Sequence, residues 1–318
     1  MTNYKRNIFS IGFYNVENLF DTVDNPHKND DQYTKKGNRK WDRKKYFKKI
    51  KKLSHVISQI GKEYTNEAPI LVGLVEVENN IVLNDLIQHK NLKKYNYKFV
   101  HYESMDERGI DVALIYRHQL FEYKSSKKYA LQFIEEDGKT DYTRDILVVS
   151  GLINNELTHI IVNHWPSRSE GEKESKYKRI LAAKRVHEII DDLKKVHKDP
   201  KIVIMGDFND NPTDESIEDH LVLKELYNPM KKVFKKGIGS LTYKRKWDLF
   251  DQIIISKNFL NNNNGKNSFV KAKVFNKKWL KVYKGKRKGS PFRTYIGPWY
   301  EGGYSDHFPV FACFKKDQ

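Results

Sequence analysis

Cysteine and long hydrophobic runs are what this chain most clearly lacks. Its 318 residues include one cysteine, Cys313, which lies in the apolar run 308–314 and reads as part of a buried strand. The chain therefore forms no internal disulfide and offers no thiolate cluster for a metal. No stretch is apolar enough to span a bilayer, and the N-terminal apolar stretch is too short for a signal peptide. We expect a cytoplasmic protein without membrane insertion, although secretion stays open.

Acidic residues are few relative to basic ones. Lysine and arginine number 59 and aspartate and glutamate 41, which gives a formal net charge of +18. Such a surface attracts polyanions over about 8 Å, the Debye length in physiological salt. The alternative is a lysine- and asparagine-rich composition spread over solvated faces. Only clustering of the cations beside a functional site would favour a role in binding.

Apolar runs and alternating patterns predict a series of strands interrupted by two long helices. The strands are expected at 7–16, 69–77, 97–102, 111–116, 145–153, 158–164, 201–206, 251–256 and 308–314. The helices are expected at 43–60 and 175–196, whereas 24–42 and 257–303 read as loops. This order indicates α/β layers. Length alone permits two domains, but acidic motifs from both halves would have to meet in one site, so we expect a single domain over residues 1–318.

Acid, amide and imidazole groups end four short segments spread along the whole chain. They are YNVEN at Asn15, GLVEVEN at Glu76, GDFND at Asp207 and SDHFPV at Asp306. Hard oxygen ligands for a divalent cation, together with histidines that move protons, are what hydrolysis of a phosphate ester requires. Because no zinc-type spacing of His and Cys is present, Mg²⁺ is expected, with Mn²⁺ as a second choice.

Asp207 and Asn209 follow the apolar strand KIVIM and a glycine turn. Two positions apart on an extended backbone, they would face the same side. Asp207 could accept a proton from water while Asn209 holds the water or the phosphate. The alternative is an ordinary turn, because Asp, Asn, Gly and Pro all favour turns.

Asp306 and His307 precede the last strand, and Asp251 opens an earlier one. An Asp–His pair alone is usually a surface loop. A buried carboxylate such as Asp251, however, could hold His307 in one tautomer, as carboxylates do for catalytic imidazoles.

Further candidates also sit at strand ends. In VNHWPSR, His164, Trp165 and Arg168 come directly after a strand, and Arg108 and Arg144 lie beside others. A second imidazole beside guanidinium groups would suit a leaving oxygen and a phosphate. Trp165, with Arg108, Arg144 and Arg168, is expected to contact the substrate. Alternatively, His164 is structural and each arginine pairs with an acid.

Glu76 and Glu78 lie on one face at the end of a strong strand, and Asn15 ends the first strand. One of the two glutamates should bind metal, and the other would be exposed or pair with a base. Asn15 would be a ligand itself or hydrogen-bond to one.

Taken together and in order, the motifs resemble the endonuclease/exonuclease/phosphatase superfamily of metal-dependent phosphoesterases. They are YNVEN, GLVEVEN, RGIDVALIYR, VNHWPSR, GDFNDNP, FDQIIIS and SDHFPV, within residues 8–314. The resemblance implies a four-layer α/β/β/α sandwich with the site at one rim. It also implies Asn15 and Glu76 as metal or phosphate ligands, with Asp306 assisting. Asp207 and Asn209 would position the attacking water, and His307 and His164 would be the two catalytic histidines.

Two positions refine this resemblance. His164 stands where deoxyribonucleases, sphingomyelinases and inositol-phosphate phosphatases carry a histidine and abasic-site endonucleases tend to carry a tyrosine. Val75 precedes Glu76 where the family usually has glutamine, so the choice between Glu76 and Glu78 as metal ligand stays open.

The segment 279–307 interleaves cations with aromatic residues. Lysines and arginines such as Arg293 could bind a phosphate chain, and rings could stack on unpaired bases. The alternative is a loop whose rings pack on the sheet.

These observations predict a magnesium-dependent nuclease with nucleic acid as its substrate and no protein partner. The same site could instead act on inositol phosphates or phospholipid headgroups, as a phosphatase or a phospholipase C-type enzyme. A third reading is a non-catalytic binding module descended from such an enzyme.

Overall fold

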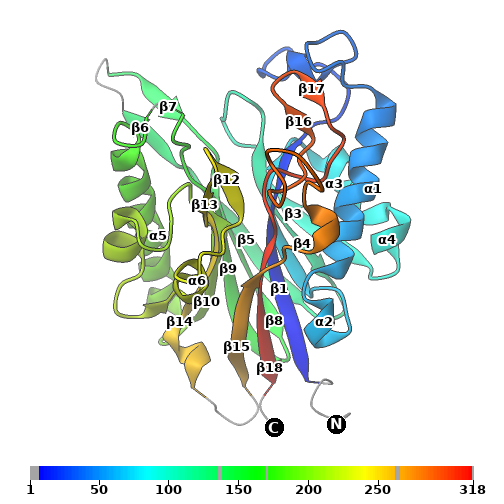
Figure 1. Cartoon of the computed structure of the whole chain (residues 1–318). Coiled ribbons are helices and arrows are strands. Elements are labelled where there is room, and N and C mark those ends of the chain that lie inside the picture. Colours follow the sequence, from blue (N-terminus) through cyan, green and yellow to red (C-terminus); the bar gives the residue numbers. More distant parts are fainter. Residues whose placement is uncertain (1–6, 135–137, 170, 262–265, 317–318) are drawn as a thin grey trace.

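Two six-stranded sheets face each other across the middle of the molecule (Figure 1). The computed structural model describes residues 7–134, 138–169, 171–261 and 266–316. In order across the first sheet, the strands are β15 (Asn267–Val274), β18 (Val310–Lys316), β1 (Ile8–Leu19), β2 (Leu71–Val77), β4 (Asp111–Arg117) and β3 (Tyr97–His101). Across the second sheet they are β11 (Leu226–Tyr227), β14 (Asp251–Ser256), β10 (Lys201–Asp207), β9 (Glu156–His164), β8 (Ile146–Ile153) and β5 (Glu122–Tyr129).

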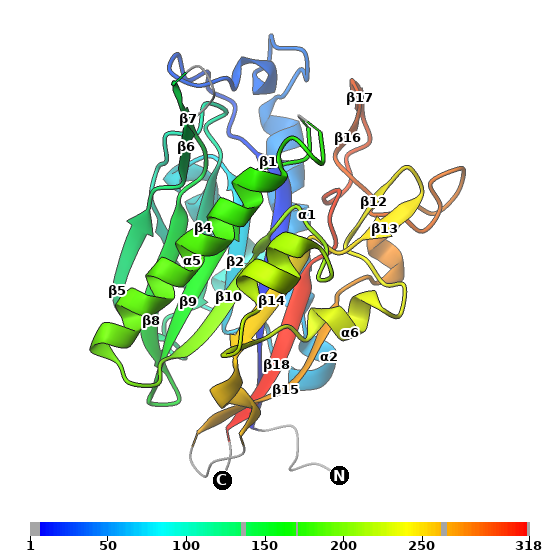
Figure 2. The same ribbon diagram turned by 90° about the vertical axis from the view of Figure 1, so that its left-hand side faces the viewer.

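Helices cover the outer face of each sheet. The first sheet is covered by α1 (Arg43–Gln59), α2 (Lys62–Thr65), α3 (Asn80–Gln88) and α4 (Lys90–Lys93). The second is covered by α5 (Lys176–Val196) and the π-helix η2 (Ser216–Leu221), as Figure 2 shows. Val186 and Ile189 of α5 pack with Ile161, Ile204 and Ile254 of that sheet in one buried cluster. The four α/β/β/α layers confirm the expected fold class.

Short elements complete the chain. They are η1 (Asp31–Tyr33), β6 (Gln132–Ile134), β7 (Thr140–Tyr142), α6 (Met230–Phe234), β12 (Leu241–Tyr243), β13 (Lys246–Asp248), η3 (Lys257–Leu260), η4 (Lys278–Leu280), β16 (Tyr295–Ile296) and β17 (Trp299–Tyr300). Within the described ranges, no helix has the length and apolar character that crossing a membrane requires.

The same pairing pattern occurs in both sheets and gathers the polar motifs at one rim. Each sheet has a central parallel pair, β1 with β2 and β9 with β10. Asn15 lies where the regular pairing of β1 with β2 ends, and Asp207 lies where the pairing of β10 with β9 ends. Neighbouring strands run the opposite way, so β14 places Asp251 directly beside Asp207. The beginning of β18 likewise lies beside the end of β1, which brings His307 to the same rim.

Gly73 of β2 faces Met205 of β10 across the two sheets. A methyl group added at Gly73 would lie 2.5 Å from Sδ of Met205, too close without a shift of the thioether. Glycine at this position therefore lets the two central strands stack and keeps their carboxyl ends together.

Several elements escape the sequence pattern, among them β5, β15 and α3. β5 (EYKSSKKY) is largely exposed and rich in lysine, as edge strands often are, so it shows no apolar alternation. β15 lies inside 257–303, where only loop was expected, because its interior residues are only half buried. Asn79 caps the start of α3, and its side chain accepts hydrogen bonds from the amides of Ile81 and Val82.

Candidate active site

Asn15 joins the two sheets at the rim. Its Nδ2 lies 3.1 Å from Oε1 of Glu76 in the same sheet and 3.0 Å from Oδ2 of Asp207 in the opposite sheet. Its Oδ1 accepts a hydrogen bond from the amide of Glu17. Side chains 192 positions apart in sequence are thus held in direct contact.

A β-bulge turns Glu76 toward the site. Val75 pairs with Val112 and Val77 with Asp111, which leaves Glu76 outside the ladder at φ 63°. The amide of Asn18 donates to its Oε2 at 2.8 Å. The bulge therefore overrides the two-residue alternation that would have kept Glu76 and Glu78 equivalent.

Glu78 has different surroundings. Its Oε2 accepts a hydrogen bond from the amide of Asp21. Burial, together with the charges of Asp21 and Asp30, raises the pKa of Glu78 to about 8. Of the two glutamates, Glu76 is the one that contacts Asn15, and through it Asp207.

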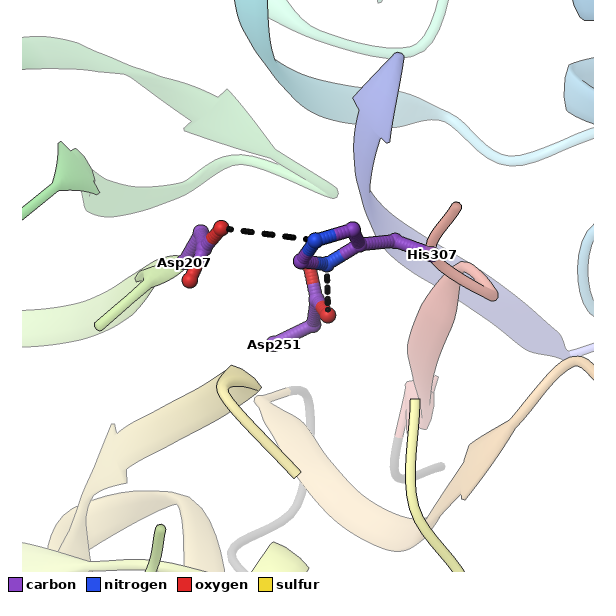
Figure 3. Close-up of side chains that lie close together, drawn as sticks. All are labelled: Asp207, Asp251 and His307. Atoms are coloured by element: carbon purple, nitrogen blue, oxygen red, sulfur yellow. Dashed lines mark hydrogen bonds and ion pairs between the residues drawn. The ribbon is translucent and has the colours of Figure 1, made fainter. Parts of the chain in front are cut away.

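His307 lies between two carboxylates (Figure 3). Its Nδ1 is 2.6 Å from Oδ2 of Asp251, and its Nε2 is 3.9 Å from Oδ2 of Asp207. Burial alone would lower the pKa of His307, but the charges of Asp251 and Asp207 outweigh burial and hold the pKa well above the ordinary histidine value. The two carboxylates therefore favour the protonated ring, whose Nδ1 donates to Asp251.

His164 approaches the same Asp207 oxygen from the other side and is neutral. Its Nε2 lies 4.0 Å from Oδ2 of Asp207. Burial, followed by the charges of Arg144 and Arg108, lowers its pKa well below the usual histidine value. Its buried Nδ1 has no hydrogen-bond partner within the described residues. Two imidazoles in opposite protonation states thus flank one carboxylate.

Asp207 itself is 2 % exposed. Burial, and secondarily the charge of Asp251, raises its pKa to about 6 against the opposing effect of His307. A carboxylate with a pKa in this range can exchange a proton with water near neutral pH.

Asn209 lies beside Asp207 for a different reason from the one expected. Its φ of 52° is left-handed, so the extended geometry that would place both side chains on one side is wrong. The Asn209 amide N–H donates to Oδ1 of Asp207 at 3.0 Å, and its Nδ2 donates to the carbonyl of Trp165 at 3.0 Å. The turn alternative is correct, and it still places Asn209 at the rim.

The expectation that Trp165 contacts substrate is wrong. The ring is fully buried, packs edge-on against Phe208 at 4.8 Å between centroids, and donates from its indole nitrogen to Asn163. Its backbone takes part in the site: the carbonyl accepts from Asn209 and from Arg144, and the amide donates to the Asp207 carbonyl. A hydrophobic ring directly after a buried strand is core rather than surface.

The arginines near the site differ in their partners: Arg144 and Arg168 form ion pairs with aspartates, whereas Arg108 contacts the side chain of Asn18. Arg168 pairs with Asp210 and Asp214 and donates to the Asn209 carbonyl, so it braces the turn that carries Asn209. Arg144 is 8 % exposed and pairs with Asp106 at 3.2 Å. Arg108 is exposed and donates to Oδ1 of Asn18. Arg108 is therefore the freer guanidinium near His164.

Glu17 and Lys49 form a buried ionic cluster that the sequence reading missed. Nζ of Lys49 lies 3.6 Å from Oε2 of Glu17 and donates to the Glu17 carbonyl and to Oγ1 of Thr294. The Glu17 carboxylate also accepts from the Thr294 amide at 2.6 Å. In the sequence, this pair is indicated only by the place of Lys49 on the apolar face of α1, one position before Ile50.

Asp306 extends this cluster toward His307. It pairs with Arg293, and its Oδ1 lies 4.0 Å from Nε2 of His307. Burial would raise the pKa of Asp306, but the charges of His307, Arg293 and Lys49 hold it below the usual aspartate value. Arg293 therefore sits beside the site as an ion-pair partner of Asp306.

The donor set fits a hard divalent cation. The Glu76 and Asp207 carboxylates both contact Asn15, and the Asp306 carboxylate lies 4.0 Å from His307. Carboxylate oxygens of this kind suit Mg²⁺ or Mn²⁺. Asp207, Asp251 and His307 could also offer ligand atoms within 4.8 Å of one another. Because the Asp251 carboxylate is already engaged by Nδ1 of His307, a cation on the Glu76 side of Asp207 would leave that contact intact.

Two small hollows adjoin these residues. One of ≈ 130 Å³ is lined by Asn18, Arg39, Trp41, Tyr295 and Asp306, among others. Another of ≈ 230 Å³ lies by Arg108, Arg144 and Ser167. Larger hollows of ≈ 750 and ≈ 810 Å³ occur around Asn154 and Lys316 and contain none of the site residues.

A sequence model described as the Endonuclease/Exonuclease/phosphatase family matches residues 10–316. The chain belongs to this family. Its members are divalent-metal-dependent phosphoester hydrolases. No curated protein sequence matched the chain.

Solved structures show the same fold at low sequence identity. TDP2 from D. rerio, complexed with single strand DNA product, is 14% identical with a TM-score of 0.59, over 97% of this chain and 99% of that one. An endonuclease/exonuclease/phosphatase family protein from Bacteroides thetaiotaomicron is 15% identical with a TM-score of 0.59, over 99% and 100%. A mannosyl-6-phosphatase from Bacteroides thetaiotaomicron is 15% identical with a TM-score of 0.57, over 96% and 99%.

Proposed function

We propose that this protein is a magnesium-dependent phosphodiesterase that hydrolyses nucleic acid in the cytoplasm as a single domain. The observation that carries the proposal is the meeting of Asp207 with Asn15, His164 and His307 at one rim, close to Glu76. A general base, two imidazoles in different protonation states and a hard-oxygen cation site are the parts that phosphodiester hydrolysis needs.

Glu76 and Asp306 would hold the cation, Mg²⁺ or Mn²⁺, with Asn15. A cation bound there supplies charge stabilisation for the phosphate oxygens. Asn15 would have to turn its amide to offer Oδ1, which now accepts from the Glu17 amide. In its present orientation Asn15 holds the Glu76 and Asp207 carboxylates together.

The remaining residues take the proton steps. Asp207 accepts the proton of the attacking water, which Asn209 orients from the adjacent turn. The His307 imidazolium, fixed by Asp251, donates a hydrogen bond from Nε2 to a phosphoryl oxygen as negative charge develops there. Neutral His164 donates a hydrogen bond to the leaving oxygen, which takes its proton from solvent water, and Arg108 and Arg144 supply positive charge near it.

Nucleic acid as the substrate is supported by the net charge of +18 and by the shared fold with a TDP2 that binds a DNA product. The test measures nicking of plasmid DNA and cleavage of a labelled single strand in Mg²⁺. We expect both activities in the native protein, loss of both in EDTA, and a fall of at least about a hundredfold in Asp207→Asn. Undiminished cleavage by Asp207→Asn would overturn the assignment.

A phosphatase acting on a sugar phosphate is the second candidate. It is supported by the shared fold with a mannosyl-6-phosphatase and by the ≈ 130 Å³ hollow, whose Tyr33, Trp41 and Tyr295 walls suit a single ring. Release of inorganic phosphate from mannose 6-phosphate and inositol phosphates, and of headgroup from phospholipid, distinguishes this candidate from a nuclease. Hydrolysis of bis-p-nitrophenyl phosphate excludes a non-catalytic binding module.

A further inference from the structure

Much of the net charge of this protein lies in two segments, 42–52 and 277–304. Together they hold 15 of the 59 lysines and arginines but only two of the 41 acids, Asp42 and Glu301. They therefore carry +13 of the formal +18. A composition bias spread evenly over the surface would not produce this concentration.

The two segments form one face of the molecule. Lys52 of α1 donates to the carbonyl of Gly302, and its ammonium lies 4.5 Å from the ring centroid of Tyr304. Lys45 and Lys48 lie 4.8 and 5.4 Å from the centroid of Tyr300. Figure 1 shows segment 277–304, in orange and red, beside α1, in blue. We call this surface the α1 face.

The α1 face is continuous with the site. Arg293 belongs to it and pairs with Asp306. Lys49 is buried beneath this face and contacts both Glu17, two residues beyond Asn15, and Thr294. A chain bound along this face would therefore reach the phosphate position beside Asp306 and His307.

Every large hydrophobic side chain exposed on the α1 face is aromatic. They are Phe47, Trp279, Tyr283 and Trp299. Trp299 is 73% and Tyr283 87% exposed, whereas Trp279 is less exposed and packs against Phe275 and Tyr304. Aliphatic side chains, which insertion into a lipid surface would use, are missing from this exposed set within the described residues. Flat rings among cations are instead the composition that binds unpaired bases and their phosphates.

We propose that the α1 face binds single-stranded nucleic acid, with Tyr283 and Trp299 stacking on bases and the surrounding lysines contacting phosphates. The inference deepens the proposed function, on which it rests, and makes the preferred substrate a single strand or a frayed end. Paired bases offer no free face to the two rings, so a duplex would gain only the phosphate contacts.

The experiment measures binding of a fluorescein-labelled single strand and of the matching duplex by anisotropy, in EDTA so that cleavage is blocked. One variant is Lys284→Gln/Lys286→Gln/Lys288→Gln, and another is Tyr283→Ala/Trp299→Ala. The matched control for the lysine variant is Lys184→Gln/Lys195→Gln/Lys198→Gln. It replaces three exposed lysines in and just after α5, which covers the opposite sheet.

We expect the lysine variant to lower the slope of log affinity against log salt by about 2 for the single strand, at about 0.7 per phosphate contact. The aromatic variant should lose about tenfold or more in affinity for the single strand at unchanged slope, with duplex binding altered by less than about twofold. The α5 control should match the native protein. Hydrolysis of bis-p-nitrophenyl phosphate in Mg²⁺ should be equal in all four proteins.

Equal losses for single strand and duplex in the aromatic variant would overturn the single-strand inference. A lysine variant that behaves like the α5 control would remove the α1 face as the binding surface. Binding to vesicles of phosphatidylserine and phosphatidylcholine is measured as well. If the native protein binds these vesicles more tightly than the single strand, and the aromatic variant does not bind them, the face is a membrane-binding surface instead. If the native protein does not hydrolyse the diester, the proposed catalytic function is wrong, whatever the binding measurements show.

Discussion

Asp251 and His307 form the most constrained contact of the site. The Asp251 carboxylate is fully buried, and its Oδ2 accepts from Nδ1 of His307 at 2.6 Å. Its Oδ1 has no partner within the described residues, so its contact with the ring is its principal hydrogen bond. Asp251 thereby decides which nitrogen of His307 faces Asp207.

Asp251→Asn should therefore damage turnover far more than stability. An amide can leave His307 in the wrong tautomer and removes the charge that keeps it protonated, so we expect kcat to fall by about 10²- to 10⁴-fold. Hydrolysis of bis-p-nitrophenyl phosphate in Mg²⁺ measures the effect. Asp111→Asn is the matched control: Oδ2 of Asp111 lies 3.1 Å from Nε2 of His101, and this pair shares no residue with the contacts among Asp251, His307 and Asp207. Equal losses in both variants would contradict a special role for Asp251.

The sandwich and most of the rim were predictable because strand ends carry local signals. Apolar runs ending in Asn15, Glu76, His164 and Asp207 are visible in the sequence, and parallel pairing places such ends together. Asp251 and His307 precede or open strands that run the opposite way, which brings them to the same rim.

The remainder depends on tertiary contacts that no local pattern encodes. The β-bulge at Glu76 separates it from Glu78, although alternation makes them equivalent. Lys49 is buried only because Glu17 and Thr294 surround it. Trp165 looks like an interfacial ring in sequence but fills the core beneath α5. Long-range partners decide each of these cases.

The distinction between Glu76 and Glu78 predicts different effects on metal binding. Glu76→Gln should weaken Mn²⁺ binding by more than about tenfold, since it removes a charged oxygen ligand. Glu78→Gln should change Mn²⁺ binding by less than about threefold, because Glu78 bonds to the Asp21 amide instead. Electron paramagnetic resonance of free Mn²⁺ measures both without relying on turnover. A larger effect at Glu78 would exchange the two roles.

The ion pair between Lys49 and Glu17 predicts a large stability effect. Lys49→Met leaves the buried Glu17 carboxylate without its cation and should cost about 3–5 kcal/mol in the free energy of unfolding. The double variant Lys49→Met/Glu17→Gln should recover most of this loss. Urea denaturation measures all three proteins. Lys48→Met is the control on the exposed side of α1, and a comparable loss there would argue against the buried pair.

His159 predicts a pH-dependent stability that is separate from the active site. The ring is 2% exposed, its Nδ1 contacts Oγ of Ser150 at 2.7 Å, and His197 lies 5.1 Å away between centroids. Burial, and then the charge of His197, lowers the pKa of His159 to about 4. The unfolded chain, with an ordinary pKa of about 6.5, binds the proton more readily, so stability falls as pH drops from about 6.5 toward 4.

The contribution of His159 should therefore be full above neutral pH and about 2 kcal/mol smaller at pH near 5. Other groups titrate over the same range, so the informative quantity is the difference between the native protein and His159→Gln, which lacks a titrating ring. As pH falls, the free energy of unfolding of the native protein should decrease relative to that of His159→Gln. His118→Gln, at an exposed position, should track the native protein at every pH. A constant difference between native protein and His159→Gln from pH 7 to 5 would show that His159 titrates alike in the folded and unfolded states.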